Sequence, residues 1–177
     1  EEVYLPSFRA AVEAGVAAVM PSFIDLAGVP ATANRALLRD TLRRRFGFRG
    51  VIVSDYGAVA ELMAHGVAAD LAEAAALALG ATVDIDMMGG AYAAGLPAAL
   101  QRGLVTMAMV DAAVARVLRL KRRLGLLADP FMRLRDTGPV SRPEDREAAG
   151  RAALQSLVLL RNESGILPLA ASGGPVV

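Results

Sequence analysis

The feature that most constrains the fold is the run Gly50-Val51-Ile52-Val53-Ser54-Asp55-Tyr56-Gly57. Three consecutive β-branched residues after a glycine are typical of a short strand that is buried on both faces, as in a parallel sheet. The strand runs directly into a carboxylate, and α/β sheets and barrels keep their chemistry at the carboxyl ends of their strands. Asp55 is therefore a candidate catalytic residue. A second interpretation, in which Ser54 or Asp55 caps the helix that follows, explains the pattern equally well.

Helical and extended patterns alternate along the first two thirds of the chain. Apolar periodicity predicts helices over residues 3–14, 34–46, 57–64, 70–79, 91–102 and 107–124, strands over 16–20, 51–54 and 82–87, and a loop over 21–30. This alternation predicts βαβ units and a parallel sheet. Because a closed (β/α)8 barrel needs eight strands, the three units would form about the last third of a TIM barrel.

After Gly125 the composition changes. Residues 128–143 hold three prolines, many charges and no periodicity, which is typical of a linker. A helix is predicted over residues 144–160 and a turn over 161–165. We therefore expect three parts: the C-terminal portion of the barrel at 1–127, the linker at 128–143, and the start of a truncated α/β sandwich domain at 144–177. The chain has no initiator Met and opens inside a predicted helix, so we interpret it as an internal piece of a longer protein.

Composition excludes several classes of function. The net charge of the 177 residues is only +1, which does not favour binding to nucleic acid or to a membrane surface. There is no Cys and only one His, His65, so disulfides, thiolate metal sites and His-rich metal sites are excluded.

Short motifs then follow one another along nearly the whole chain. They include Leu5-Pro6-Ser7-Phe8, Val19-Met20-Pro21-Ser22-Phe23, Phe46-Gly47-Phe48-Arg49-Gly50, Val53-Ser54-Asp55-Tyr56, Val83-Asp84-Ile85-Asp86-Met87, Gly125-Leu126-Leu127-Ala128-Asp129-Pro130 and Ser156-Leu157-Val158-Leu159-Leu160-Arg161-Asn162-Glu163. In this order and spacing the chain resembles the bacterial β-glucosidases of glycoside hydrolase family 3.

The resemblance implies a retaining glycosidase with a (β/α)8 barrel followed by an α/β sandwich domain. It implies hydrolysis of terminal, non-reducing β-linked sugars in a small glucoside or oligosaccharide, with no metal and no cofactor. Asp55 would be the nucleophile that forms a glycosyl-enzyme intermediate. The family's sugar-binding acid, Arg and Lys-His pair belong before Glu1, and the general acid/base belongs after Val177, so the partner of Asp55 is expected outside the chain.

Four further residues are candidates for substrate binding. By the resemblance, Tyr56 would pack against the sugar, and Phe23 stands where many members have a Tyr that bonds the nucleophile. Met20 ends a strand near the sugar site, although methionine is also a common core filler. Asp84 and Asp86 alternate along a predicted strand and share a face; Asp86 is the better functional candidate, with a structural role equally open.

Other polar residues have simpler interpretations. Asp25 is expected to be a turn or N-cap residue, and His65 a loop residue. The basic run Arg43-Arg44-Arg45 is expected to be a solvated helix face.

Two alternatives to the β-glucosidase interpretation stay open. The chain could be a catalytically inactive fragment or degenerate barrel piece, or it could belong to a β-xylosidase or β-N-acetylglucosaminidase of the same family. The parent protein is expected to be periplasmic or secreted, with a cytoplasmic location open. An isolated third of a barrel would expose strand edges and apolar faces, which predicts poor solubility or self-association.

Overall fold

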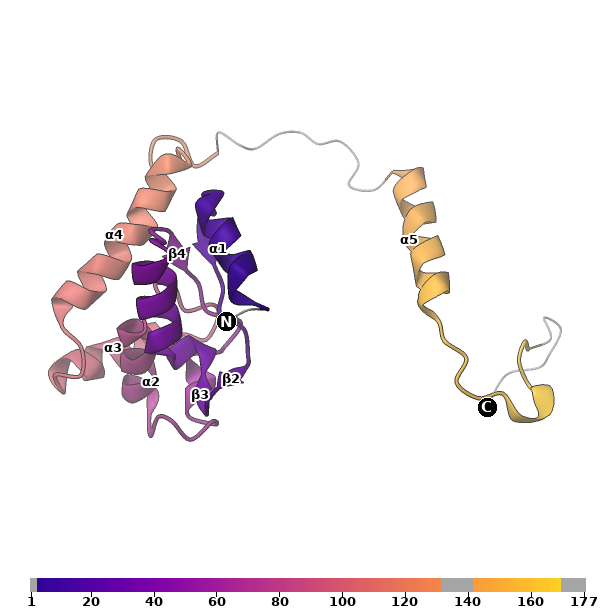
Figure 1. The fold of residues 1–177 in the computed structure, drawn as a ribbon, viewed down its shortest axis with the longest axis horizontal. Helices are drawn as coiled ribbons and strands as arrows, with labels where there is room; N and C mark the ends of the chain where they lie inside the picture. The colour runs from indigo at the N-terminus through magenta and orange to yellow at the C-terminus, as the bar shows by residue number, and fades with distance from the viewer. Residues whose placement is uncertain (1–2, 132–141, 170–177) are drawn as a thin grey trace. The chain divides into compact units, whose positions relative to one another are not determined.

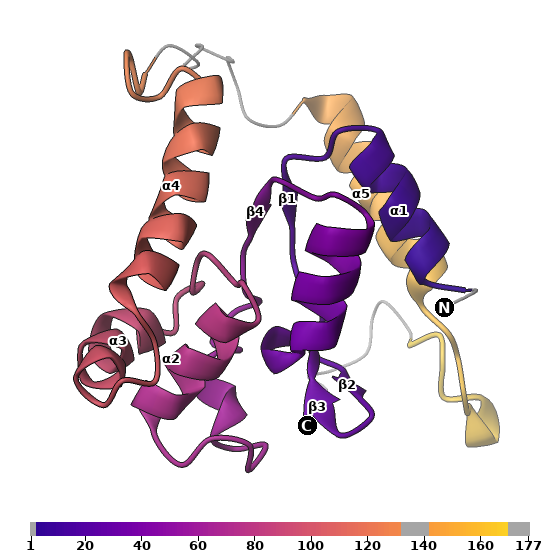
Figure 2. The ribbon, with the colours of Figure 1, turned by 60° about the vertical axis from the view of Figure 1, so that its left-hand side comes forward.

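Two short parallel strands organise the N-terminal part of the computed structural model, which describes residues 3–131 and 142–169. Strand β1 (Ala18–Val19) pairs with β4 (Val51–Ile52), with Ala18 opposite Val51. Both residues of β4 are completely buried, as expected for a strand that is covered on both faces. In Figures 1 and 2 the strands lie between helix α1 (Leu5–Glu13) and helix α4 (Met107–Arg123).

The strand predicted over residues 82–87 is reduced to one parallel bridge, between Val53 and Ile85. Side chains replace the missing ladder bonds. The Ile52 N–H donates to the Asp84 carboxylate at 2.9 Å, and the Val83 carbonyl accepts the Tyr92 hydroxyl at 2.8 Å. Burial raises the pKa of Tyr92, so this hydroxyl keeps its proton and remains a donor.

The loop predicted over residues 21–30 is wrong in part, because it contains a small antiparallel hairpin. Strands β2 (Asp25–Leu26) and β3 (Val29–Pro30) pair across Ala27 and Gly28, which have φ values of 55° and 77°. Positive φ at both central residues is the backbone that a tight hairpin turn requires, and an Ala-Gly pair is a weak sequence signal for it. Asp25 therefore lies in a strand rather than in a turn or at an N-cap. The short 3-10 helix η1 (Ala31–Ala33) follows.

Neither of the helices predicted after β3 and after β4 is a regular α-helix. Helix η2 (Ala36–Arg45) is a π-helix, and the Asn34 side chain accepts the Leu37 N–H at 2.9 Å, as expected for a capping residue. The segment after Asp55 forms turns and one short 3-10 helix, η3 (Ala60–Leu62).

The core lies between the strands and the helices that follow them. Its largest fully buried side chains include Ile52, Leu62, Val59 and Val83. Helix α2 (Leu71–Gly80) begins at Asp70, whose side chain accepts the Glu73 N–H at 2.9 Å. Helix α3 (Ala91–Gln101) packs against α2, and Figures 1 and 2 show the two side by side.

Helices α2 and α3 approach each other most closely at Gly95. A β-carbon at this position would lie 2.2 Å from the Leu71 carbonyl oxygen. Alanine gains about 1 kcal/mol over glycine in a helix, but overpacking against backbone costs roughly 1–3 kcal/mol. We expect Gly95→Ala to lower the free energy of unfolding, measured by urea denaturation. Gly80→Ala is the matched control: its β-carbon would meet nothing within 4 Å, so it should be neutral or stabilising.

The chain divides into two units, residues 1–133 and 134–177, and the second is described by itself. It contains helix α5 (Pro143–Ser156) and the 3-10 helix η4 (Glu163–Gly165). The helix predicted over 144–160 ends early, because the backbone becomes extended at Leu157, with ψ of 126°. The side chains of the apolar run that follows are exposed, with Leu160 91% exposed. Most of the predicted linker, residues 132–141, lies outside the described residues.

Candidate active site

The carboxyl ends of three parallel segments meet at one edge of the N-terminal unit. β1 pairs with β4 in parallel, and Val53 bridges Ile85 in parallel, so the residues that follow all leave from the same edge. Met20 follows β1, Asp55 follows β4, and Asp86 follows Ile85. The structure thus brings candidate residues from three separate stretches of sequence to one edge, where enzymes with parallel strands carry their chemistry.

The Asp55 side chain is only partly engaged by the protein. The residue is half-buried, and its Oδ1 accepts the Tyr56 N–H at 2.7 Å. Among the described residues no other donor reaches the carboxylate, which leaves Oδ2 without a protein partner. Neither Ser54 nor Asp55 caps a helix through its side chain, because the Ser54 hydroxyl bonds the Asp55 carbonyl and the Met87 N–H instead. The helix-cap interpretation is therefore wrong.

Apolar side chains are exposed at the same edge. Tyr56 is 64% exposed, and Phe23 and Met20 are about half exposed. Phe23 lies in the loop that leaves β1, while Tyr56 directly follows Asp55. Exposed aromatic and methionine side chains beside a carboxylate provide the apolar surface that a sugar ring can cover.

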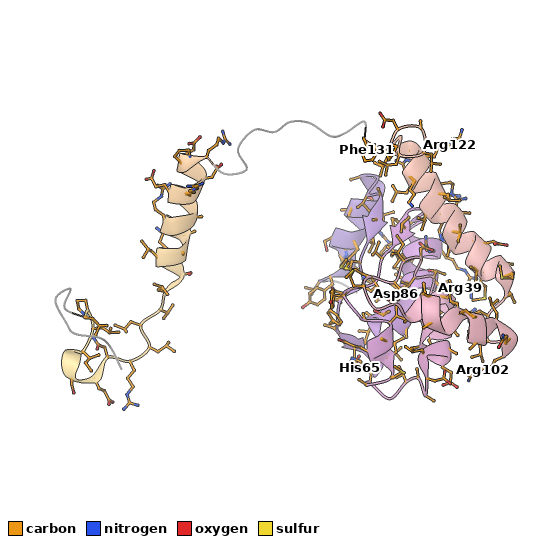
Figure 3. All side chains as sticks on the ribbon, turned by 180° about the vertical axis from the view of Figure 1, so that it is seen from behind. Arg39, His65, Asp86, Arg102, Arg122 and Phe131 are labelled. Carbon is orange, nitrogen blue, oxygen red and sulfur yellow. The ribbon has the colours of Figure 1, made fainter. Side chains whose placement is uncertain are left out.

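Asp86 is tied to the start of helix α3. Its Oδ2 accepts the Tyr92 N–H at 3.2 Å, so the helix N-terminus stabilises the carboxylate. Its Oδ1 is buried and has no hydrogen-bond partner among the described residues. A β-carbon at Gly89 would lie 2.8 Å from this oxygen, so the loop that follows Asp86 closes over it. Figure 3 shows Asp86 in the body of the N-terminal unit and His65 at its lower edge.

Asp84 forms a buried ion cluster that the sequence did not reveal. Its side chain is 0% exposed, and it pairs with Arg43 at 2.6 Å and with Arg116 at 2.7 Å. Arg43 also donates to the Gly50 and Thr82 carbonyls. The expectation that Arg43 lies on a solvated helix face is therefore wrong, although Arg44 does lie on one. Burial lowers the pKa of Arg43 and the Asp84 charge opposes this, so the guanidinium remains charged.

One signal in the sequence could have identified this cluster. A buried carboxylate needs a cation or several donors. Asp84 follows Val83 and precedes Ile85 in an apolar run, so a partner from a neighbouring element was required. Arg43 meets that need because η2 is wound as a π-helix, in which side chains five residues apart share a face. Leu38 and Arg43, five residues apart, are both turned inward.

Two pockets in the N-terminal unit do not include Asp55 in their linings. One, of about 460 Å³, is lined by both Asp84 and Asp86 together with Tyr92 and the apolar face of α4. The other, of about 580 Å³, opens at the amino ends of β1 and β4, and its lining includes five arginines: Arg43, Arg49, Arg116, Arg119 and Arg123. Asp55, Tyr56, Phe23 and Met20 line neither of these two pockets.

Many hydrolases have an α/β fold with a partly solvent-exposed carboxylate at the carboxyl ends of parallel strands. Similarity to known proteins identifies the family among them. Residues 1–120 match the family model described as the glycosyl hydrolase family 3 N terminal domain. The match covers more than half of the chain, so the chain belongs to glycosyl hydrolase family 3. The matched residues form a mixture of helices and short strands.

Similar proteins include two curated glycosidases. The chain is 42% identical to a periplasmic beta-glucosidase of Salmonella typhimurium over 96% of its own length and 23% of the relative's. It is 40% identical to a beta-xylosidase of Formosa agariphila, over 95% of its length and 25% of the relative's. The chain thus spans about a quarter of the length of the curated relatives that it matches.

Solved structures agree with these relatives. A beta-glucosidase from Listeria innocua in complex with glucose superposes on 94% of this chain, with a TM-score of 0.74 and 43% identity. That alignment also covers only 23% of the solved chain. A mutant of the Listeria protein has been solved with laminaribiose.

Proposed function

We propose that the chain is part of a retaining β-glycosidase of the β-glucosidase type, with Asp55 as the catalytic nucleophile. The observation that carries the proposal is the position of Asp55: it follows a buried parallel strand and has one carboxylate oxygen that no hydrogen-bond donor reaches within residues 3–131 and 142–169. Membership of family 3 and the two glycosidase relatives support the reaction class.

The geometry fits the first step of a retaining mechanism. The carboxylate of Asp55 attacks the anomeric carbon, the glycosidic bond breaks, and a covalent glycosyl-enzyme intermediate forms. A second carboxyl group, about 5–5.5 Å from the first, protonates the departing oxygen and then activates water. We place this second group outside the chain. Tyr56, Phe23 and Met20 would contact the sugar.

We also propose that Asp86 binds the substrate, once the loop that follows it has moved. Its Oδ1 is an acceptor without a partner in the described residues, at the correct edge for a sugar hydroxyl. Because that oxygen is buried beside Gly89, the loop after Asp86 must shift before a hydroxyl can reach it.

We assign the parts of the chain on the same basis. Residues 1–127 are proposed as the C-terminal portion of a (β/α)8 barrel, 128–143 as a linker, and 144–177 as the start of a sandwich domain. Support comes from the two parallel pairings and from the matched share of the relatives' length. The barrel strands that complete the site and the second domain would belong to the parent protein.

A β-xylosidase is the second candidate, because the Formosa relative is nearly as similar as the Salmonella one. The ratio of kcat/KM for an aryl β-glucoside to that for an aryl β-xyloside, measured on the full-length protein, distinguishes the two. The parent is proposed to be periplasmic by its similarity to the Salmonella protein. Every helix in the described ranges is too short or too polar to cross a membrane.

Covalent labelling tests the role of Asp55. A 2-deoxy-2-fluoro β-glycoside slows breakdown of the glycosyl-enzyme, so the full-length protein should accumulate a labelled peptide with the sugar on Asp55, found by mass spectrometry. A label on another carboxylate would sink the assignment. The chain of residues 1–177 alone should form no labelled product, because the barrel strands that we expect to carry the sugar-binding acid, Arg and Lys-His pair lie outside it. Labelling there would contradict the proposed division of the site.

A further inference from the structure

The hydroxyl of Ser54 joins the two loops that carry the candidate site. Ser54 is completely buried. Its Oγ donates to the Asp55 carbonyl at 2.9 Å and accepts the Met87 N–H at the same distance. A serine hydroxyl has one proton to donate and lone pairs to accept, so this single group satisfies one partner on each side.

Backbone hydrogen bonds flank this hydroxyl. The Ser54 N–H donates to the Ile85 carbonyl at 2.8 Å, and the Gly57 N–H donates to the Met87 carbonyl at 2.9 Å. The segment 54–57 is therefore fastened to the segment 85–87 at three successive points. Only the middle point depends on a side chain, so a substitution can remove it and leave the other two.

We propose that Ser54 is a positioning residue, which sets the place of the Asp55 carboxylate relative to the 86–90 loop through its bonds to the Asp55 carbonyl and the Met87 N–H. This inference rests on the proposed function, in which Asp55 attacks the sugar. A displacement of about 1 Å in a reacting group can cost on the order of 100-fold in rate, whereas substrate binding is spread over many contacts. Substitution of Ser54 should therefore lower the rate of nucleophilic attack more than it changes KM.

The test compares Ser54→Ala with Val59→Ala in the full-length protein. Val59 is also completely buried and lies five residues further along the same segment, but its side chain makes no hydrogen bond. Both variants should lower the melting temperature. Only Ser54→Ala should lower kcat, and the rate of labelling by the fluoro-glycoside, by about 10-fold to 100-fold per folded molecule. KM should change by less than about threefold for both.

Amide hydrogen exchange gives a second readout, which does not depend on the rate of the glycosidase reaction. Ser54→Ala should speed exchange at Met87, and Val59→Ala should not. Equal rates of labelling per folded molecule in the two variants would overturn the proposal, as would unchanged exchange at Met87. If Ser54→Ala does not fold, Ser54→Thr keeps the hydroxyl and should retain both the Met87 protection and the labelling rate; a protected variant with a slow labelling rate would overturn it.

The proposed function and this inference fail in different ways. If the unsubstituted full-length protein is not labelled at Asp55, the proposed function is wrong, whatever the variants do. If it is labelled there but the rate does not respond to Ser54, the positioning role alone is wrong.

Discussion

Replacement of Asp55 by alanine in the full-length protein is expected to lower kcat by on the order of 10⁴-fold or more, the scale seen when a catalytic nucleophile is removed. The carboxylate is only half-buried, and within the part of the chain that the structure describes it accepts one hydrogen bond, from the N–H of Tyr56. Its loss should therefore change the melting temperature little. A large loss of rate with a small loss of stability is the signature of a group that acts on the substrate.

Chemical rescue makes this prediction sharper. Azide can occupy the space left by the missing carboxylate and attack the anomeric carbon from the same side. Asp55→Ala should then convert an activated aryl β-glycoside to the α-glycosyl azide, which is identified by NMR. Asp40→Asn is the matched control, because Asp40 is exposed and pairs with the exposed Arg44 on η2. Full activity in Asp55→Ala, or a rescued product of β configuration, would refute the nucleophilic role.

The second large effect concerns stability. Asp84→Ala should lower the free energy of unfolding by about 3 kcal/mol, because it leaves two largely buried guanidinium groups without their counter-charge. The carboxylate also accepts the Ile52 N–H, so one strand amide would lose its partner as well. Urea denaturation followed by circular dichroism measures the change. Asp40→Ala removes an exposed ion pair and should cost at most about 0.5 kcal/mol.

A second variant separates the charge effect from the loss of the side chain. Asp84→Asn keeps the shape and can still accept hydrogen bonds, yet it removes the negative charge between Arg43 and Arg116. If the buried charges dominate, Asp84→Asn should lose most of the stability that Asp84→Ala loses. A loss of less than about 1 kcal/mol for both variants would show that the two guanidinium groups are stabilised by solvent without the Asp84 charge.

The sequence predicted most of the regular elements because their signals are local. The β-branched run at Val51–Val53 predicted β4, and apolar periodicity predicted α2, α3 and α4 close to their observed bounds. The strand predicted over residues 82–87 is shorter in the structure because side chains of Asp84 and Tyr92 take the places of some backbone partners, and no periodicity encodes such an exchange. The hairpin at Asp25–Pro30 was missed because Ala27 occupies a turn position that usually holds Asn, Asp or Gly.

The candidate site divides in the same way. Asp55 could be found from sequence because a strand of β-branched residues leads directly to it. The hydroxyl of Ser54 could not be assigned, because its partner Met87 lies on a different segment, and sequence reasoning treated it as a local cap. The ion pair of Arg43 could not be predicted, because three consecutive arginines, Arg43 to Arg45, are typical of a solvent-exposed helix face. Long-range partners of this kind depend on the assembled fold.

The buried cluster around Asp84 also limits how this protein can be shortened or recombined. Arg43 lies on η2, Asp84 lies in the segment that pairs beside β4, and Arg116 lies on α4. Three segments that are far apart in sequence therefore form one ion cluster, in which a carboxylate pairs with two guanidinium groups. A crossover point between any two of them joins segments from different parents. Such a hybrid keeps the ion cluster only if both parents supply the same charges at these three positions. Library designs for improved variants should therefore exchange residues 43–116 as a single block.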